Sequence, residues 1–220
     1  MLNFPLLTSS DMPQDLGTMY RWRNWTPEQR EQILNERRKR NHPDHIPAHI
    51  VSDSTTYYMV TAACYEHNLV IGHSDQRLAD FSLDLCTLLY QNVKQVFAWV
   101  VLANHYHVLV DSTDVLALLK LLGRLHGRTS YQWNLQDSSQ GRRVWCNACE
   151  TMMKSEGHFY SSINYILNNP VHHGYCEKWT DWPFSNASDY LEQVGRVVAL
   201  ARWRSYPIYD YGAKWDPPGL

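Results

Sequence analysis

The 220-residue sequence lacks a long apolar run, a secretory signal and a strong net charge. Its longest apolar stretches, such as Val96–Ala103, are far shorter than the roughly 20 residues that a transmembrane helix needs. No basic segment followed by an apolar core and a small-residue cleavage site opens the chain, so no secretory signal is predicted. A phosphate-cradling GxxxxGK[ST] loop is also absent.

Composition excludes an intrinsically disordered chain, because 44% of residues are apolar and 19% are charged. A chain of this length can bury about 70% of its unfolded surface, so it needs neither disulfides nor a metal to fold. The five cysteines are odd in number. Without a secretory signal they predict reduced thiols in a cytoplasmic protein.

The net charge of −2 does not favour nucleic-acid binding, but the charge is unevenly distributed. Seven Arg or Lys and three Glu lie between Tyr20 and His42, which gives this segment a charge of 7 − 3 = +4. The chain also contains nine Trp and fourteen Tyr. Aromatic side chains fill cores, and they also stack on unpaired bases.

Residue patterns predict a basic N-terminal extension, a catalytic domain and a tail. Thr26-Pro27 resembles a helix start, and a mostly polar helix would run to about Arg40. A proline-containing linker follows. The predicted boundaries are 1–54 for the extension, 55–190 for the domain and 191–220 for the C-terminal tail.

Within the domain, β-branched and apolar runs alternate with amphipathic segments. The expected elements are strand Thr55–Cys64, helix Asp75–Asn92 capped by Ser74 or Asp75, strands Val96–Ala103 and His105–Val110, helix Thr113–Leu135, strand Val144–Met153, and helix Glu156–Asn169 ended by Pro170. The order β-α-β-β-α-β followed by a helix predicts an α+β fold, a ferredoxin-like antiparallel sheet with helices on one face.

The strongest local feature is His105-Tyr106-His107, in the predicted strand. Residues i and i+2 of a strand point to the same side, so the two imidazoles would share one face and Tyr106 would take the other. Histidines in so apolar a strand are costly to bury unless a partner accepts their lone pairs. A divalent metal is one such partner. Half-exposed histidines bonded to water are the alternative.

A second feature is Tyr165 and Asn169, which lie four residues apart and share a face of the predicted helix. An amide oxygen suits magnesium or manganese. A tyrosine hydroxyl beside it could act as a nucleophile. By itself the pair also fits a packing tyrosine and a helix stop before Pro170.

A third candidate is Cys146-Asn147-Ala148-Cys149, whose spacing fits half of a zinc site. No second CxxC follows, whereas a structural zinc normally needs four ligands. We therefore expect these to be two thiols in a buried strand.

Taken together, the first two features resemble the REP-associated tyrosine transposases, which belong to the HUH superfamily of single-strand DNA transposases. The downstream Asn169-Pro170-Val171 and Trp182-Pro183-Phe184-Ser185 also match, and Tyr20-Arg21-Trp22-Arg23 resembles the family's short Tyr-Arg-Arg element. Two positions depart from the pattern. Tyr106 is bulkier than the usual aliphatic residue, and Trp22 interrupts the Tyr-Arg-Arg element.

The resemblance implies metal-dependent cleavage of single-stranded DNA and strand transfer at REP-type hairpins, through a 5′-phosphotyrosine intermediate. By motif position, Tyr165 would be the nucleophile, and His105, His107 and Asn169 would hold a divalent metal, Mg²⁺ or Mn²⁺. The covalent intermediate conserves bond energy, which agrees with the absence of an ATP-binding loop.

The implied partner is single-stranded DNA carrying an imperfect hairpin, bound by a monomer or homodimer in the cytoplasm, associated with the bacterial nucleoid and with no membrane contact. The resemblance suggests that a single-stranded tetranucleotide at the hairpin foot is read by Tyr20, Arg21, Trp22 and Arg23. Basic residues that could line the hairpin are Arg124, Arg128, Arg142 and Arg143.

Two other functions remain open from the sequence. One is a hairpin-binding protein of the same fold without cleavage. The other is a metal-dependent hydrolase that uses His105 and His107, with Tyr165 purely structural. The DNA sequence recognised and the role of the C-terminal tail are not predicted.

Overall fold

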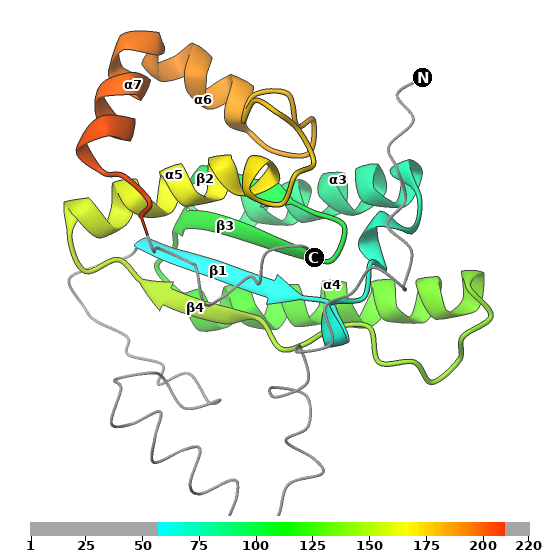
Figure 1. Cartoon of the computed structure of the whole chain (residues 1–220). Helices are drawn as coiled ribbons and strands as arrows, with labels where there is room; N and C mark the ends of the chain where they lie inside the picture. The colour runs from blue at the N-terminus through cyan, green and yellow to red at the C-terminus, as the bar shows by residue number, and fades with distance from the viewer. Residues whose placement is uncertain (1–56, 210–220) are drawn as a thin grey trace, which may run out of the picture. The chain divides into compact units, whose positions relative to one another are not determined.

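The computed structural model describes residues 57–209, which form a four-stranded sheet with helices on both sides (Figure 1). The elements in chain order are β1 (Tyr57–Ala63), the 3₁₀ turns η2 (Tyr65–His67) and η3 (Ile71–His73), α3 (Asp75–Asn92), β2 (Gln95–Val101), β3 (His105–Asp111), α4 (Val115–Gln136), β4 (Cys149–Met152), α5 (Glu156–His172), α6 (Ala187–Val194) and α7 (Arg196–Ser205).

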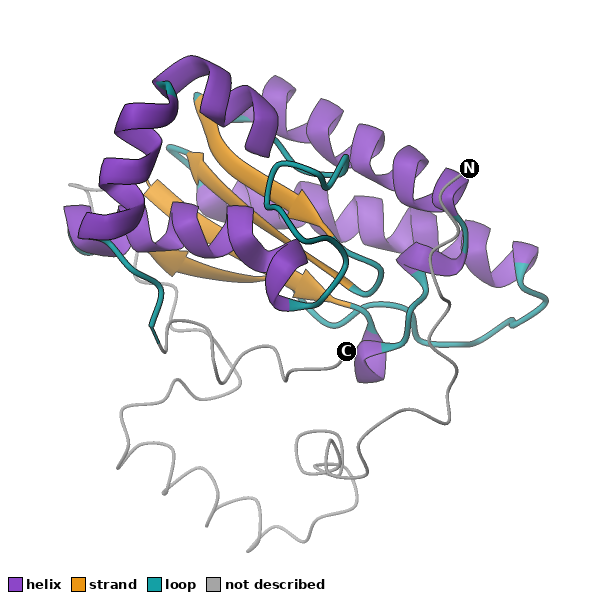
Figure 2. Cartoon of the chain, turned by 45° about the horizontal axis from the view of Figure 1, so that its top comes forward, coloured by secondary structure: helices purple, strands orange, loops and turns teal. Residues whose placement is uncertain are grey.

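The sheet has the order β2-β3-β1-β4, and every neighbouring pair is antiparallel. With α3 and α4 on one face, this is the β-α-β-β-α-β arrangement predicted from the sequence, and the α+β fold class is confirmed (Figure 2). The central strands bring distant residues into register. Thr61 of β1 lies opposite His107 of β3, and Val100 of β2 lies on its other side.

The three long helices begin at side-chain caps that the sequence contains. Ser74, Asp114 and Ser155 each accept a hydrogen bond from the backbone N–H three residues further on, at 3.2, 2.8 and 3.1 Å. The prediction for α3 is confirmed at both ends. Its buried apolar side chains are Leu78, Phe81, Leu85 and Leu89.

Helix α5 packs on the other face of the sheet from α3 and α4, so the expected placement of helices on one face holds for α3 and α4 but not for α5 (Figure 2). The prediction that Pro170 ends this helix is wrong, because α5 runs to His172 with Pro170 in its last turn. The missing N–H of a proline costs one backbone bond to the preceding turn, and a buried turn can tolerate that loss. The chain leaves the helix at Gly174, whose φ of 72° is a conformation that favours glycine.

The prediction of a long strand at Val144–Met153 is only partly right, since β4 covers Cys149–Met152. Trp145 makes one isolated bridge with Cys64. Because β4 is an edge strand, Cys149 is exposed, and the expectation of two thiols in a buried strand is wrong. All five cysteines lie within the described residues and are thiols.

The N-terminal extension, including its predicted helix, and the end of the tail lie outside the described residues. The division into three parts therefore stays a prediction. Helix α6 spans the proposed boundary at 190. Among residues 57–209, no helix is both long enough and apolar enough to cross a membrane.

Candidate functional site

The sequence-predicted site residues Tyr165, His107 and His105 come together as a row of rings between β3 and α5. Successive ring centroids are 5.2 Å apart from Tyr165 to His107 and 5.0 Å apart from His107 to His105. His173, which follows α5, extends the row at 5.1 Å from His105. All of the predicted members are buried, with Tyr165 4% exposed and His107 fully covered. The strand alternation and the helix spacing thus converge on one site.

Asn169 joins this row because it lies one helical turn beyond Tyr165. Its Oδ1 atom lies 3.0 Å from Nε2 of His105, and its side chain is fully buried. On the other side of the same ring, His105 Nδ1 lies 2.6 Å from Oδ1 of Asn104. The Asn104 amide is oriented by its own Nδ2, which donates to the carbonyl of His67 at 3.1 Å. The Nδ1–H of His105 therefore donates to Asn104.

A neutral imidazole has a single N–H, so Nε2 of His105 then carries a lone pair that faces the lone pairs of Asn169 Oδ1. Two such acceptors at 3.0 Å repel unless a proton or cation lies between them. The amide nitrogen of Asn169, meanwhile, is buried with no hydrogen-bond partner among the described residues. Turning the amide over would let this nitrogen donate to Nε2, so the same pair can be satisfied with or without a cation.

His107 is oriented in the same way as His105, through its Nδ1 atom. That atom lies 2.7 Å from the hydroxyl of Thr61, the residue directly opposite in β1. Metal-binding histidines almost always use their second ring nitrogen in this manner, because the bond fixes the ring and the tautomer. Thr61 and Asn104 were not predicted from the sequence.

The donor set fits a divalent metal through two imidazoles and an amide. Adjacent ligands around an octahedral ion at about 2.1 Å are about 3.0 Å apart, which matches the His105–Asn169 separation of 3.0 Å. Within residues 57–209, no group of three or more His, Cys, Asp or Glu side chains is arranged to hold a metal ion. The amide of Asn169 is therefore essential to the candidate set.

Tyr106 points away from the site, as the strand alternation predicts. Its hydroxyl lies 3.0 Å from Nε2 of His126 on α4, and its ring packs near Phe81 and Trp145. Burial lowers the pKa of His126 to about 4 and raises the pKa of Tyr106. His126 is thus neutral at pH 7, and its Nε2 can accept a hydrogen bond from the hydroxyl of Tyr106. Tyr106, the bulky residue between the two histidines, therefore packs into the core on the opposite face of β3.

Tyr160 is the other tyrosine of α5 that could act as a nucleophile, and it lies elsewhere. Its ring stacks on Tyr206 at 5.0 Å, and the guanidinium of Arg202 lies 4.7 Å above it. Tyr165, in contrast, lies against His107.

The predicted DNA-binding residues do not join this site. Tyr20, Arg21, Trp22 and Arg23 lie outside the described residues. Arg124 and Arg128 are exposed on α4, on the opposite side of the sheet, and Arg128 pairs with Asp84 at 2.8 Å. Arg143 lies over the ring of Tyr65 at 4.7 Å.

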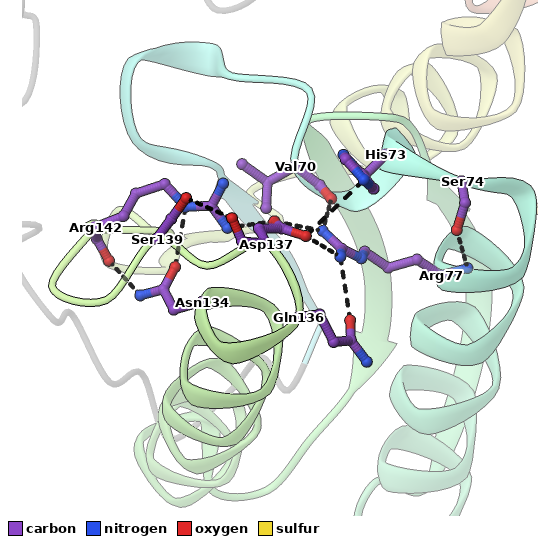
Figure 3. A network of polar contacts seen from close by, with 9 residues as sticks. All are labelled: Val70, His73, Ser74, Arg77, Asn134, Gln136, Asp137, Ser139 and Arg142. Carbon is purple, nitrogen blue, oxygen red and sulfur yellow. Dashed lines mark hydrogen bonds and ion pairs between the residues drawn. The ribbon is translucent and has the colours of Figure 1, made fainter.

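Arg142 belongs to a polar network around Asp137 at the end of α4 (Figure 3). Asp137, whose side chain is 9% exposed, accepts from Arg142 at 2.7 Å and from Arg77 of α3 at 3.0 Å. Arg142 also donates to Asn134 at 3.0 Å. These hydrogen bonds hold the start of the loop between α4 and β4.

A groove of about 410 Å³ lies between α4 and this loop. Gly123 and Gly127 form part of the helix side, and a Cβ at either position would meet nothing within 4 Å. Polar and basic side chains border it, namely His126, Ser130, Arg142, Arg143 and Asn147. The groove and the histidine row are on opposite faces of the sheet.

His173 is the residue of the row that sequence analysis missed. It follows Asn169 by four positions, so the Tyr165–Asn169 spacing continued for one more turn would have indicated it. Both of its ring nitrogens are buried.

No protein-family model and no curated protein matches this chain. Among solved structures, the chain is similar to one described as a REP-associated tyrosine transposase bound to a REP hairpin. The two share 17% sequence identity over 70% of this chain and 88% of the other, with a TM-score of 0.47. The likeness is weak, so the function proposed below rests on the side chains of this chain.

Proposed function

We propose that this chain cleaves single-stranded DNA beside a REP-type hairpin and transfers the strand, with Tyr165 as the nucleophile. The observation that supports it best is the pairing of Tyr165 and Asn169, on one face of α5, with His107 and His105 on β3. A phenol, two imidazoles and an amide in one buried site are the groups that metal-assisted phosphoryl transfer to a tyrosine needs.

In the proposed step, the phenol oxygen of Tyr165 attacks the scissile phosphorus and loses its proton. The bond from phosphorus to the 3′ oxygen breaks, and that oxygen takes up a proton and leaves as a 3′-hydroxyl. A 5′-phosphotyrosine remains, and attack by another 3′-hydroxyl reverses the step to join a new strand. Bond energy is conserved, so no nucleotide triphosphate is required.

His105, His107 and Asn169 would hold the divalent cation, Mg²⁺ or Mn²⁺. When bound, the cation supplies charge neutralisation at the scissile phosphate, which a phenol with a pKa near 10 needs in order to react at pH 7. Asn104 and Thr61 orient the two imidazoles through their Nδ1 atoms. Tyr165 is 4% exposed, so most of its side chain is covered by its neighbours.

Hairpin DNA would contact the basic groove along α4 and the N-terminal Tyr20–Arg23 element. Arg124 and Arg143 would contact phosphates. Arg143 uses its Nε–H for the carbonyl of Trp145 and has no carboxylate partner among residues 57–209, whereas Arg142 is engaged by the carboxylate of Asp137. The two glycines of the groove allow a phosphate backbone to approach the helix closely. This division places strand cleavage on one face of the sheet and hairpin binding on the other.

A metal-dependent hydrolase fits the site less well, because such a site usually adds a carboxylate to its histidines. Asp111 shares the β3 face with His107, but it is four residues along the strand, about 13 Å away. That distance is too long for both side chains to bind one cation.

The test is a denaturing gel of a labelled single strand that carries an imperfect hairpin with single-stranded DNA at its foot. With Mn²⁺ or Mg²⁺ we expect a covalent protein–DNA adduct, which EDTA abolishes and Tyr165→Phe removes. The matched control is Tyr160→Phe, which should form the adduct. An adduct that survives Tyr165→Phe would show that Tyr165 is not the nucleophile. Hairpin binding with no adduct from the wild type would favour the DNA-binding alternative.

A further inference from the structure

Helix α5 is held on a second face by the C-terminal segment, in addition to its contact with the sheet. Glu156, Tyr160 and Asn164 are spaced by four residues and form one stripe along α5. Asn164 and Tyr165 are consecutive, so this stripe lies about 100° around the helix from the face that carries Tyr165.

One residue, Tyr206, contacts all three members of the stripe. Its hydroxyl donates to Glu156 Oε1 at 2.6 Å, and its ring stacks on Tyr160 at 5.0 Å. Its backbone carbonyl accepts from Nδ2 of Asn164 at 2.8 Å. The same Nδ2 atom lies 3.4 Å from the carbonyl of Arg202, at the end of α7. Asn164 is 3% exposed, so these bonds are shielded from water.

The segment that carries Tyr206 is itself tied to the sheet. Asn186, just before α6, donates to the carbonyl of Phe97 at 3.2 Å and accepts from the N–H of Trp99 at 2.8 Å, both on the edge strand β2. Arg202 of α7 donates to the hydroxyl of Tyr190 in α6 at 3.1 Å. The path from β2 through α6 and α7 to Tyr206 is therefore connected, and α5 is held between two parts of one scaffold (Figure 1).

We propose that Tyr206 and Asn164 are positioning residues, which fix the rotation of α5 about its axis and thereby the place of the Tyr165 hydroxyl. The inference rests on the proposed function of Tyr165. A tyrosine hydroxyl extends roughly 8–9 Å from the helix axis, so a roll of about 10° moves it by about 1.5 Å. A misplacement of about 1 Å can lower a reaction rate by about 100-fold. Contact with the sheet alone resists such a roll from one side only.

The test compares Tyr206→Ala with the matched control Tyr209→Ala in the full chain, at a temperature where circular dichroism shows both to be folded. Tyr209 belongs to the same segment and is 89% exposed. With the labelled hairpin strand and Mn²⁺, we expect Tyr206→Ala to slow single-turnover adduct formation by about 10- to 100-fold. The dissociation constant for the hairpin should change less than about 3-fold, because the binding groups lie elsewhere.

Two milder variants separate positioning from general destabilisation. Tyr206→Phe keeps the ring stack and the carbonyl, so a loss of about 2- to 5-fold is expected from one missing hydrogen bond. Glu156→Gln retains an oxygen that accepts a hydrogen bond from Tyr206, so this variant should form the adduct at the wild-type rate. Equal losses of rate and affinity in Tyr206→Ala, or a wild-type rate in that variant, would overturn the positioning role.

Amide hydrogen exchange judges the contact without reference to cleavage. Peptides covering Glu156–His172 should exchange faster in Tyr206→Ala than in the wild type, and at the wild-type rate in Tyr209→Ala. If the wild type forms no adduct through Tyr165, the proposed function fails, while exchange still reports whether Tyr206 holds α5. Unchanged exchange in Tyr206→Ala refutes the holding contact itself.

Discussion

The ion network around Asp137 should be one of the most sensitive points of the fold. Asp137→Asn keeps the shape of the side chain and removes its charge, which leaves Arg77, 7% exposed, without a counterion. Breaking a buried pair by removing one partner costs about 3–5 kcal/mol of the free energy of unfolding. For a chain of this size, that corresponds to a fall in Tm of about 6–20 °C. Urea unfolding at pH 7 measures the loss directly.

The matched control is Asp84→Asn, which breaks the ion pair between Asp84 and Arg128, whose side chains are 45% and 55% exposed. An exposed pair contributes less than about 1 kcal/mol. The two variants differ only in burial and in the number of partners. Equal losses of stability in Asp137→Asn and Asp84→Asn would refute the argument that burial gives the network its weight.

The loss of unfolding free energy in Asp137→Asn should depend on pH in a definite direction. Arg77 and Arg142 hold the pKa of Asp137 well below its ordinary value. The stabilisation is therefore fully present above the unfolded-state pKa of about 3.9 and is lost as the pH falls toward the folded-state value. The difference between wild type and Asp137→Asn should be constant from pH 5 to 8 and should shrink below pH 4. A difference that stays constant down to pH 2 would contradict the assignment.

Three further predictions concern the site and the groove. His107→Ala should abolish adduct formation and the heat of Mn²⁺ binding in calorimetry, while hairpin affinity changes less than about 3-fold; unchanged cleavage would remove the metal from the proposal. Arg143→Ala should weaken hairpin binding and reduce the slope of log affinity against log salt by about 1, whereas Arg142→Ala should mainly lower Tm, because Asp137 loses a partner. Tyr106→Phe leaves the buried Nε2 of His126 without its tyrosine donor, so it should lower the free energy of unfolding, measured by urea titration, by about 1–3 kcal/mol. The control Tyr131→Phe should cause no loss, because Tyr131 is 74% exposed.

The elements that the sequence predicted well are those whose signals are local. Ser74 caps α3, and its apolar side chains recur at helical spacing, so both ends of this helix could be placed. The alternation in His105-Tyr106-His107 correctly predicted which face of β3 each of the three side chains occupies. Local signals fail where tertiary packing overrides them. A buried turn of α5 tolerates Pro170, and β4 is shorter than its apolar pattern because it pairs with β1 only over Cys149–Met152.

The surroundings of the site could not be predicted, because its partners come from distant parts of the chain. Thr61 meets His107 across 46 positions. Neither Thr61 nor Asn104 belongs to a recognisable motif, and both act by orienting a ring through one nitrogen. Sequence patterns indicated which side chains share a face, whereas the register of β1 and β3 decides that Thr61 orients His107.

Tyr106 illustrates why the two faces of β3 have to be considered together. The position between the histidines carries a side chain of a size that the sequence resemblance did not lead us to expect, yet the residue is fully buried. It is accommodated because Nε2 of His126 accepts a hydrogen bond from the Tyr106 hydroxyl. The ring of His126 stacks on Trp145 at 4.2 Å, and the indole N–H of Trp145 donates to the hydroxyl of Thr129 at 3.0 Å. These contacts hold β3 from the side opposite the histidine row. The strand that carries His105 and His107 is therefore fixed by hydrogen bonds on both faces, and the same strand borders both the candidate catalytic site and the layer beneath the groove.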